Sequence, residues 1–354
     1  MFRVTRTAIA TLAVCTALVS AATLQPASAS AATRPPTWVQ QFPKASPPAS
    51  YGAAMAYDGK TKQVVLFGGM GAKSILSGTW EWDGSNWAEL RPQTSPPPLY
   101  DASMAYDTKT GQVILFGGRG ASGVSGSTWE WDGNNWTELH PATSPPARSS
   151  ASMAYSPAPG VIVLFGGTGA SGSALSGTWV WGGTNWASFS NSTSCATCSS
   201  PGPLYGASLS TDLASGLVMF GGHGAQTLSS ETMLWDRFGW SPVTPVVTPP
   251  ALYGASMAYY YYQPPGATFA SDEEVILFGG TGTSGYLSST WAWYMVWSGS
   301  NWGKLNPPQH PSPRYGAAMV FDSSSDQLLL FGGTGPHGVL DDTWAWEVPT
   351  WYPA

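Results

Sequence analysis

Charged side chains are scarce in this chain. Of its 354 residues, 14 are Lys or Arg and 20 are Asp or Glu, so the formal net charge is −6. Nucleic-acid binding depends on clustered Lys and Arg that neutralise phosphates, and no such stripe occurs in the sequence. The low charge, together with 13% aromatic residues, also excludes a disordered chain, because such chains combine high net charge with few apolar groups.

Long runs of helix-forming residues are missing as well. Gly and Pro, with 42 and 30 copies, make up about a fifth of the chain, and both disfavour the interior of a helix. Coiled coils and long helices are therefore excluded.

The N-terminus has the order of a secretory signal peptide. Arg3 and Arg6 precede an apolar stretch over residues 8–24, which is followed by small residues that fit cleavage after Ala29 or Ala31. We therefore expect a signal peptide over residues 1–31 and a secreted, extracellular mature chain over residues 32–354, without a membrane span. An uncleaved membrane anchor is the alternative, although the apolar stretch is barely long enough to span a bilayer.

Only three cysteines occur, and cleavage would remove Cys15. The other two, Cys195 and Cys198, form a C-x-x-C pair, which in an exported protein indicates a local disulfide that closes a short loop. A redox dithiol and half of a zinc site are the alternatives. The first lacks a βαβ context, and the second lacks another ligand pair at suitable spacing.

One sequence unit recurs six times after the N-terminal segment. A Phe-Gly-Gly triplet ends an apolar run at intervals of 49 to 58 residues, and its Phe stands at Phe67, Phe116, Phe165, Phe220, Phe278 and Phe331. A Tyr-Gly-Ala-Ser-Met-Ala-Tyr-like stretch precedes each triplet, and a Thr-Trp-x-Trp-like stretch follows it. These landmarks predict four short strands per unit, separated by Gly, Asp and Pro turns. Six tandem units of this kind predict an all-β, six-bladed β-propeller that forms a single domain over residues 32–354.

The units resemble kelch repeats. The resemblance lies in the apolar run into Phe-Gly-Gly, the stretch from Trp80 to Trp87 and the Pro-Arg-Tyr-Gly sequence at 313–316, and it covers residues 36–354. It implies four-stranded antiparallel blades and a ring closed by an N-terminal strand. Trp38 precedes Tyr51 by the same 13 residues that separate equivalent landmarks elsewhere, so residues 37–44 are expected to supply that strand. Trp351 competes for the same outer position in the sixth blade, and the sequence does not decide between them.

The resemblance also implies a ligand site at the mouth of the central channel, on the face that carries the links between strands two and three and between blades. Residues there that differ between units include Asp101 and a candidate binding set, namely Arg119, Arg148, His223, Arg314 and His337. Arginines of this set could clamp a carboxylate or sulfate. Solvated surface positions are the alternative, and Arg314 matches an Arg that kelch repeats often keep.

The fifth unit carries two insertions that fall on the opposite face. They place aromatic residues together in a candidate docking or sugar-stacking patch, made of Tyr260, Tyr261, Tyr294 and Trp297. The alternative is that the two long loops pack on each other.

These features predict a secreted binding module for a carbohydrate or protein partner, without a cofactor or bound metal. The alternative is an extracellular carbohydrate-active enzyme, because kelch relatives include sialic-acid mutarotases and galactose oxidase. An oxidase site would need copper ligands and a Cys crosslinked to a Tyr, whereas the two mature cysteines are already paired. A mutarotase-like site would need a carboxylate and an Arg in the channel.

Overall fold

The computed structural model describes residues 36–193, 195–262, 272–296 and 299–347, all of them in one unit of the chain, residues 34–354. Every regular element within these ranges is a strand, and none is a helix. The described residues consequently contain no helix long and apolar enough to cross a membrane. The predicted signal peptide lies outside the described residues.

Six four-stranded antiparallel sheets account for most of the described strands. Sheet one contains β2 (Ala54–Asp58), β3 (Gln63–Phe67), β4 (Thr79–Trp82) and β5 (Trp87–Leu90). Sheet two contains β6 (Ser103–Asp107), β7 (Gln112–Phe116), β10 (Thr128–Trp131) and β11 (Trp136–Leu139). Sheet three contains β12 (Ser152–Ser156), β13 (Val161–Phe165), β14 (Thr178–Trp181) and β15 (Trp186–Phe189). Sheet four contains β16 (Ser208–Asp212), β17 (Gly216–Phe220), β18 (Thr232–Asp236) and β19 (Gly239–Val243).

Sheets five and six follow the same plan. Sheet five contains β21 (Ser256–Tyr262), β22 (Asp272–Phe278), β25 (Thr290–Val296) and β26 (Gly299–Leu305). Sheet six contains β27 (Ala318–Asp322), β28 (Gln327–Phe331), β31 (Thr343–Glu347) and β1 (Thr37–Gln41). Short ribbons lie in the links after the second strands, namely β8 (Arg119–Gly120) with β9 (Gly123–Val124), β23 (Thr281–Gly282) with β24 (Gly285–Tyr286), and β29 (Thr334–Gly335) with β30 (Gly338–Val339). β23 also pairs with β20 (Leu252–Tyr253), which precedes the first strand of sheet five.

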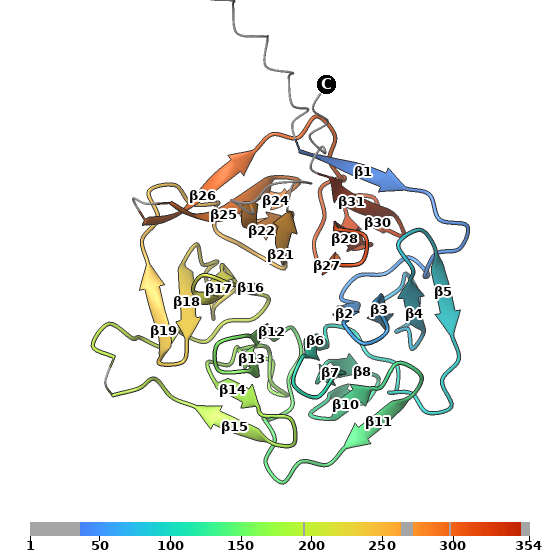
Figure 1. Cartoon of the computed structure of the whole chain (residues 1–354), viewed down its shortest axis with the longest axis horizontal. Coiled ribbons are helices and arrows are strands. Elements are labelled where there is room, and N and C mark those ends of the chain that lie inside the picture. The colour runs from blue at the N-terminus through green and yellow to red at the C-terminus, as the bar shows by residue number, and fades with distance from the viewer. Residues whose placement is uncertain (1–35, 194, 263–271, 297–298, 348–354) are drawn as a thin grey trace, which may run out of the picture. The chain divides into compact units, whose positions relative to one another are not determined.

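The sheets stand around a common centre with their first strands innermost (Figure 1). Each first strand contacts the first strand of the next sheet, and β27 contacts β2 in turn. Repeated four-stranded sheets arranged in this way are typical of propeller-like folds. The prediction of an all-β repeat fold is confirmed.

The core lies between neighbouring sheets. The second strands are continuous apolar runs buried on both faces, as predicted, and Val65 and Phe67 of β3 are at most 1% exposed. They pack with Val113 and Leu115 of the next sheet. Because each sheet covers the faces of its two neighbours, burial of these runs holds adjacent repeats together.

A tryptophan on each outer strand links its sheet to the preceding one. Its indole Nε1–H donates to the hydroxyl of the Thr that begins the third strand of the preceding sheet, at 2.9 to 3.0 Å. The six pairs are Trp87 with Thr343, Trp136 with Thr79, Trp186 with Thr128, Trp240 with Thr178, Trp302 with Thr232, and Trp38 with Thr290. We call this set the Trp–Thr ladder.

The N-terminal strand supplies the sixth rung of that ladder. β1 pairs antiparallel with β31, and Trp38 stands opposite Trp346. In sheet one Trp87 stands opposite Trp82 in the same register. Trp38 therefore holds the outer position of sheet six, whereas its predicted competitor, Trp351, lies outside the described residues.

The predicted disulfide between Cys195 and Cys198 is present. Its loop follows β15 and lies along β19 of the next sheet, where the N–H of Ser199 donates to the carbonyl oxygen of Trp240 at 2.8 Å. The bond spans a sequence separation of three residues, so it constrains this loop alone.

Removing one hydroxyl of the Trp–Thr ladder should destabilise the fold. In a Thr178→Val variant the shape is nearly kept, but the buried indole N–H of Trp240 loses its acceptor at 2.9 Å. An unsatisfied buried donor costs about 1–3 kcal/mol of unfolding free energy, which guanidinium denaturation would measure. The control is the exposed Thr184→Val, expected to change stability by less than about 0.5 kcal/mol. Equal effects of the two variants would contradict a stabilising role for the ladder.

Candidate functional site

Six backbone hydrogen bonds form a closed cycle at the centre of the sheets. They join the residues that directly follow the repeated Tyr position, at distances of 2.7 to 2.9 Å. In chain order these residues are Gly52, Asp101, Ser150, Gly206, Gly254 and Gly316. Each N–H donates to the carbonyl oxygen of the preceding member, and Gly52 donates to Gly316. We call this set the central cycle.

The central cycle requires a left-handed backbone at every position. All six φ angles lie between +52° and +65°, a region in which residues with a Cβ are disfavoured and Gly is not. Sheets two and three nevertheless use Asp101 and Ser150, at φ of 54° and 52°. Asp tolerates this conformation better than most residues. Strain of this kind persists where the surrounding structure imposes it, and it is enriched at functional sites.

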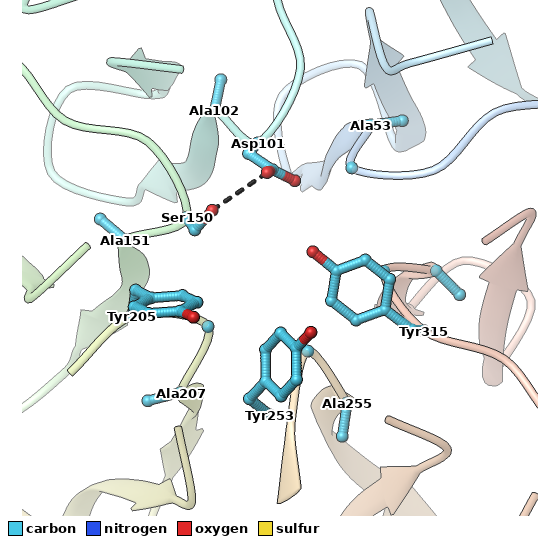
Figure 2. A pocket seen from close by; sticks show the side chains of 15 residues that line it. Ala53, Asp101, Ala102, Ser150, Ala151, Tyr205, Ala207, Tyr253, Ala255 and Tyr315 are labelled. Atoms are coloured by element: carbon cyan, nitrogen blue, oxygen red, sulfur yellow. Dashed lines mark hydrogen bonds between the residues drawn. The ribbon is translucent and has the colours of Figure 1, made fainter. Parts of the chain in front are cut away.

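A cavity of about 130 Å³ opens on the central cycle. We call it the channel mouth. Figure 2 shows Asp101 and Ser150 on one side of it and the hydroxyls of Tyr205, Tyr253 and Tyr315 directed inward from the other. Small residues complete the wall, namely Gly52, Ala53, Ala102, Ala151, Gly206, Ala207, Gly254, Ala255, Gly316 and Ala317.

The tyrosines of five repeats form a continuous arc of ring contacts, and three of them line the channel mouth. Ring centroids lie 6.2 Å apart for Tyr100 and Tyr51, 6.0 Å for Tyr51 and Tyr315, 5.3 Å for Tyr315 and Tyr253, and 5.8 Å for Tyr253 and Tyr205. Edge and tilted contacts at these distances are favourable for aromatic pairs. The third repeat has Ser149 at the equivalent position, so the arc of tyrosines is open on that side.

Two glycines of the central cycle, Gly52 and Gly254, are required both for their positive φ angle and because a neighbouring side chain lies against their backbone. A Cβ on Gly254 would overlap the ring of Tyr315, and a Cβ on Gly52 would overlap the carboxylate of Asp101. The side chains of Tyr315 and Asp101 therefore lie directly over the backbone of a neighbouring repeat, which fixes their positions at the mouth.

Asp101 is the acidic group of the channel mouth. Its Oδ2 accepts a hydrogen bond from the Ser150 hydroxyl at 3.0 Å. Burial raises the pKa of Asp101 to about 6, although the Ser150 hydrogen bond and the positive charge of Arg119 act in the opposite direction. None of the ion pairs formed by the described residues includes this carboxylate.

The hydroxyls of Tyr205 and Tyr315 keep their protons at neutral pH. Burial, followed by the nearby charge of Asp101, raises the pKa of Tyr315 far above its ordinary value. Burial also raises the pKa of Tyr205. Each phenol can then both donate and accept a hydrogen bond.

Two of the predicted binding residues lie at the rim of the mouth. The ring of His223 stacks on Tyr205 with centroids 5.1 Å apart, and it meets Tyr253 edge-on at 5.5 Å. Arg119 pairs through its backbone with Tyr100, close enough to Asp101 to influence its pKa. The predicted His337 is exposed in the turn between β29 and β30.

The other two predicted arginines are structural. Arg314, at 1% exposure, pairs with both carboxylate oxygens of Asp342 at 2.6 and 2.8 Å and donates to the carbonyl oxygen of Gly332 at 2.8 Å. Arg148, at 2% exposure, donates to the carbonyl oxygens of Pro146 and Gly166. The expectation that these guanidiniums present themselves to a ligand is therefore corrected, because their hydrogen bonds are directed into the protein.

The aromatic patch predicted in the fifth repeat is described only in part. Tyr260 is 2% exposed and meets Phe321 edge-on at 5.7 Å, so it belongs to the core and not to an exposed patch. Tyr294 packs partly buried against the same core cluster, and Tyr261 is half-buried. Trp297 lies outside the described residues.

The opposite end of the central channel is lined mainly by apolar side chains. A cavity of about 360 Å³ there is lined chiefly by residues of the first strands, including Met55, Met104, Met153, Met257 and Met319. In the part of the chain that the structure describes, no three His, Cys, Asp or Glu side chains come together in a way that could hold a metal ion. Among the residues that line the two cavities, the one carboxylate, that of Asp101, lies at the mouth.

No family model matches the chain. A stretch of 86 residues is 33% identical to the tRNA wybutosine-synthesizing protein 4 of Emericella nidulans. This match covers 22% of the present chain and 8% of that protein, so the chain corresponds to less than a tenth of its relative. A match of this extent shows a local likeness alone.

The inward orientation of Tyr205, Tyr253 and Tyr315 was not predicted from the sequence. They stand at a repeated position, and repeated residues were attributed to the common core. A signal was present nevertheless, because Asp101 and Ser150 interrupt a position that is Gly in the other four repeats.

The elevated pKa of Asp101 predicts a pH dependence of stability. Because the pKa is about 6 in the folded chain and about 3.9 when unfolded, the folded state binds more protons between these values. The contribution of Asp101 to stability should therefore fall as pH rises from about 4 to 6 and level off above. Denaturation should show that the unfolding free energy of the wild type, relative to that of Asp101→Asn, decreases from about pH 4 to pH 6 and is constant at higher pH. A constant difference would contradict the pKa assignment.

The buried guanidinium of Arg148 lacks, among the described residues, the carboxylate partner that Arg314 has, so we expect that supplying one will stabilise the fold. Arg314 has Asp342 as its partner, whereas Gly177 stands at the equivalent place, two residues before the strand-three Trp, and a Cβ there would lie 4.0 Å from Nη2 of Arg148. Gly177→Asp should raise the unfolding free energy above that of the neutral Gly177→Asn by about 1.5–3 kcal/mol, the contribution of a charged hydrogen bond. Equal denaturation midpoints for the two variants would show that no pair forms.

Proposed function

We propose that this chain is a secreted, six-bladed, kelch-type β-propeller that acts as a binding module, and that the channel mouth holds a protruding group of its partner. In this proposal the six sheets are the blades, and β1 closes the ring in sheet six. The resemblance of the repeats to kelch units supports the assignment. The N-terminal signal pattern and the Cys195–Cys198 disulfide support secretion, since disulfides persist in oxidising compartments.

The observation that carries the proposal is the replacement of Gly by Asp101 and Ser150 in the central cycle. Four repeats use the residue that the backbone prefers, whereas these two accept a left-handed conformation with a side chain. Both side chains line the mouth and are hydrogen-bonded to each other. In a repeat fold, residues that depart from the shared pattern at the expense of stability are candidates for function.

The size of the mouth limits what can enter. Its volume of about 130 Å³ corresponds to about four water molecules at roughly 30 Å³ each. One polar end group with its first carbon atoms fits this space, whereas a complete sugar ring would have to remain largely outside. We therefore favour a protein partner that inserts a side chain, over the carbohydrate partner that the sequence also allowed.

A ligand panel on the mature protein tests this function. Capped amino-acid amides and methyl glycosides, each at millimolar concentration, should include at least one compound that raises the thermal midpoint, because binding to the folded state alone stabilises it. Tyr253→Ala should abolish that shift. The control is Tyr155→Ala, at the opposite end of the channel, which should preserve it. A shift that survives Tyr253→Ala would contradict binding at the mouth, as would the absence of any shift.

A further inference from the structure

The carboxylate of Asp101 carries a negative charge into the mouth, and no cation among the described residues forms an ion pair with it. Its hydrogen-bond partner is the neutral hydroxyl of Ser150. The nearest influence of opposite sign comes from Arg119, which forms no ion pair with it among the described residues. A half-buried acid in this position favours a ligand that supplies positive charge, because burial penalises the ionised carboxylate unless it is compensated.

The backbone of the mouth offers acceptors rather than donors. Anion sites are commonly built from converging backbone N–H groups. Here the six N–H groups of the central cycle all donate to neighbouring carbonyl oxygens. Each of those carbonyls retains a second lone pair. The cycle therefore does not supply donors for an anion.

The side chains opposite Asp101 are suited to the same kind of ligand. The phenol oxygens of Tyr205, Tyr253 and Tyr315 point into the mouth (Figure 2), and phenol oxygens accept hydrogen bonds. Tyrosine rings are also electron-rich at their faces, which attracts cations. An ammonium group has three donors and no acceptor, so it matches a carboxylate on one side and hydroxyl oxygens on the other.

We propose that the channel mouth binds a primary ammonium group, namely the end of a lysine side chain on a protein partner. This inference rests on the proposed binding function and names its ligand class. The ammonium would approach Asp101 and the Ser150 hydroxyl, while its methylene chain would leave the mouth between the tyrosine rings. The cavity accepts such a group, which is close to a water molecule in size.

Isothermal titration at low salt and pH 8 tests the proposal with matched probes. The protein should bind Nα-acetyl-lysine methylamide, and it should not bind the Nε-acetylated form, which has the same backbone without the charge. Asp101→Asn should weaken binding at least about tenfold, because it removes a charge-assisted hydrogen bond. Asn is compatible with the left-handed backbone at this position.

Arg119→Gln is expected to act differently from Asp101→Asn on the affinity for the lysine probe. Loss of its positive charge near Asp101 should leave the affinity for the lysine probe unchanged or raise it. If the wild-type protein binds butyrate and Arg119→Gln does not, the rim is an anion site and the proposal is overturned. Equal affinity for the two lysine probes would overturn it as well.

Failure of this inference can be told apart from failure of the proposed function. If methyl glycosides or neutral capped amides stabilise the protein in a Tyr253-dependent manner while the lysine probe does not bind, the mouth is a binding site but not for ammonium. If neither the lysine probe nor any panel compound binds at the mouth, both proposals are overturned.

Discussion

The central cycle of backbone hydrogen bonds is the constraint on which the rest of the structure depends. Each repeat donates one N–H and accepts one through its carbonyl, so every repeat is bonded to both neighbours at the innermost point. This geometry fixes a left-handed backbone at all six positions. It also brings together residues that lie far apart in the sequence, including Gly52 and Gly316. The direction of each first strand follows from it, because each strand starts within a few residues of its cycle member.

The Trp–Thr ladder repeats this linkage at the outer edge. Each repeat is thus joined to the preceding one by a backbone hydrogen bond near the centre and by an indole–hydroxyl hydrogen bond at the outer edge. Buried apolar strands lie between these two links. Trp38 shows how strict the arrangement is, since the sixth rung comes from a strand at the other end of the sequence. Stability in such an array depends on the interfaces between neighbours, and the loss of one rung affects the two sheets that share it.

Much of the architecture could be predicted from the sequence, because strands and turns are local and recur. The Phe-Gly-Gly triplets placed the buried second strands correctly, and the spacing of Trp38 placed the additional outer strand. The site could not be predicted in the same way. The sequence does not distinguish an exposed Arg from an Arg whose guanidinium is hydrogen-bonded inside the protein. The structure shows that Arg148 and Arg314 are of the buried type, because each donates to the carbonyl oxygen of a glycine in a Phe-Gly-Gly triplet. The convergence of Tyr205, Tyr253 and Tyr315 likewise depends on the ring geometry and not on local pattern.

The same cycle that organises the fold determines the chemistry available at its centre. Because its N–H groups are all engaged, the selectivity of the mouth depends on side chains, and four of the six cycle members have none. Asp101 and Ser150 therefore have a disproportionate influence, since they bring the carboxylate and one of the hydroxyls to a site otherwise built from carbonyls, phenols and alanines. A positive charge placed there would meet the carboxylate of Asp101 on one side and phenol oxygens on the other, whereas a negative charge would be repelled by that carboxylate. The selectivity proposed for the mouth would thus follow from the two positions, Asp101 and Ser150, at which the backbone cycle carries a polar side chain in place of Gly.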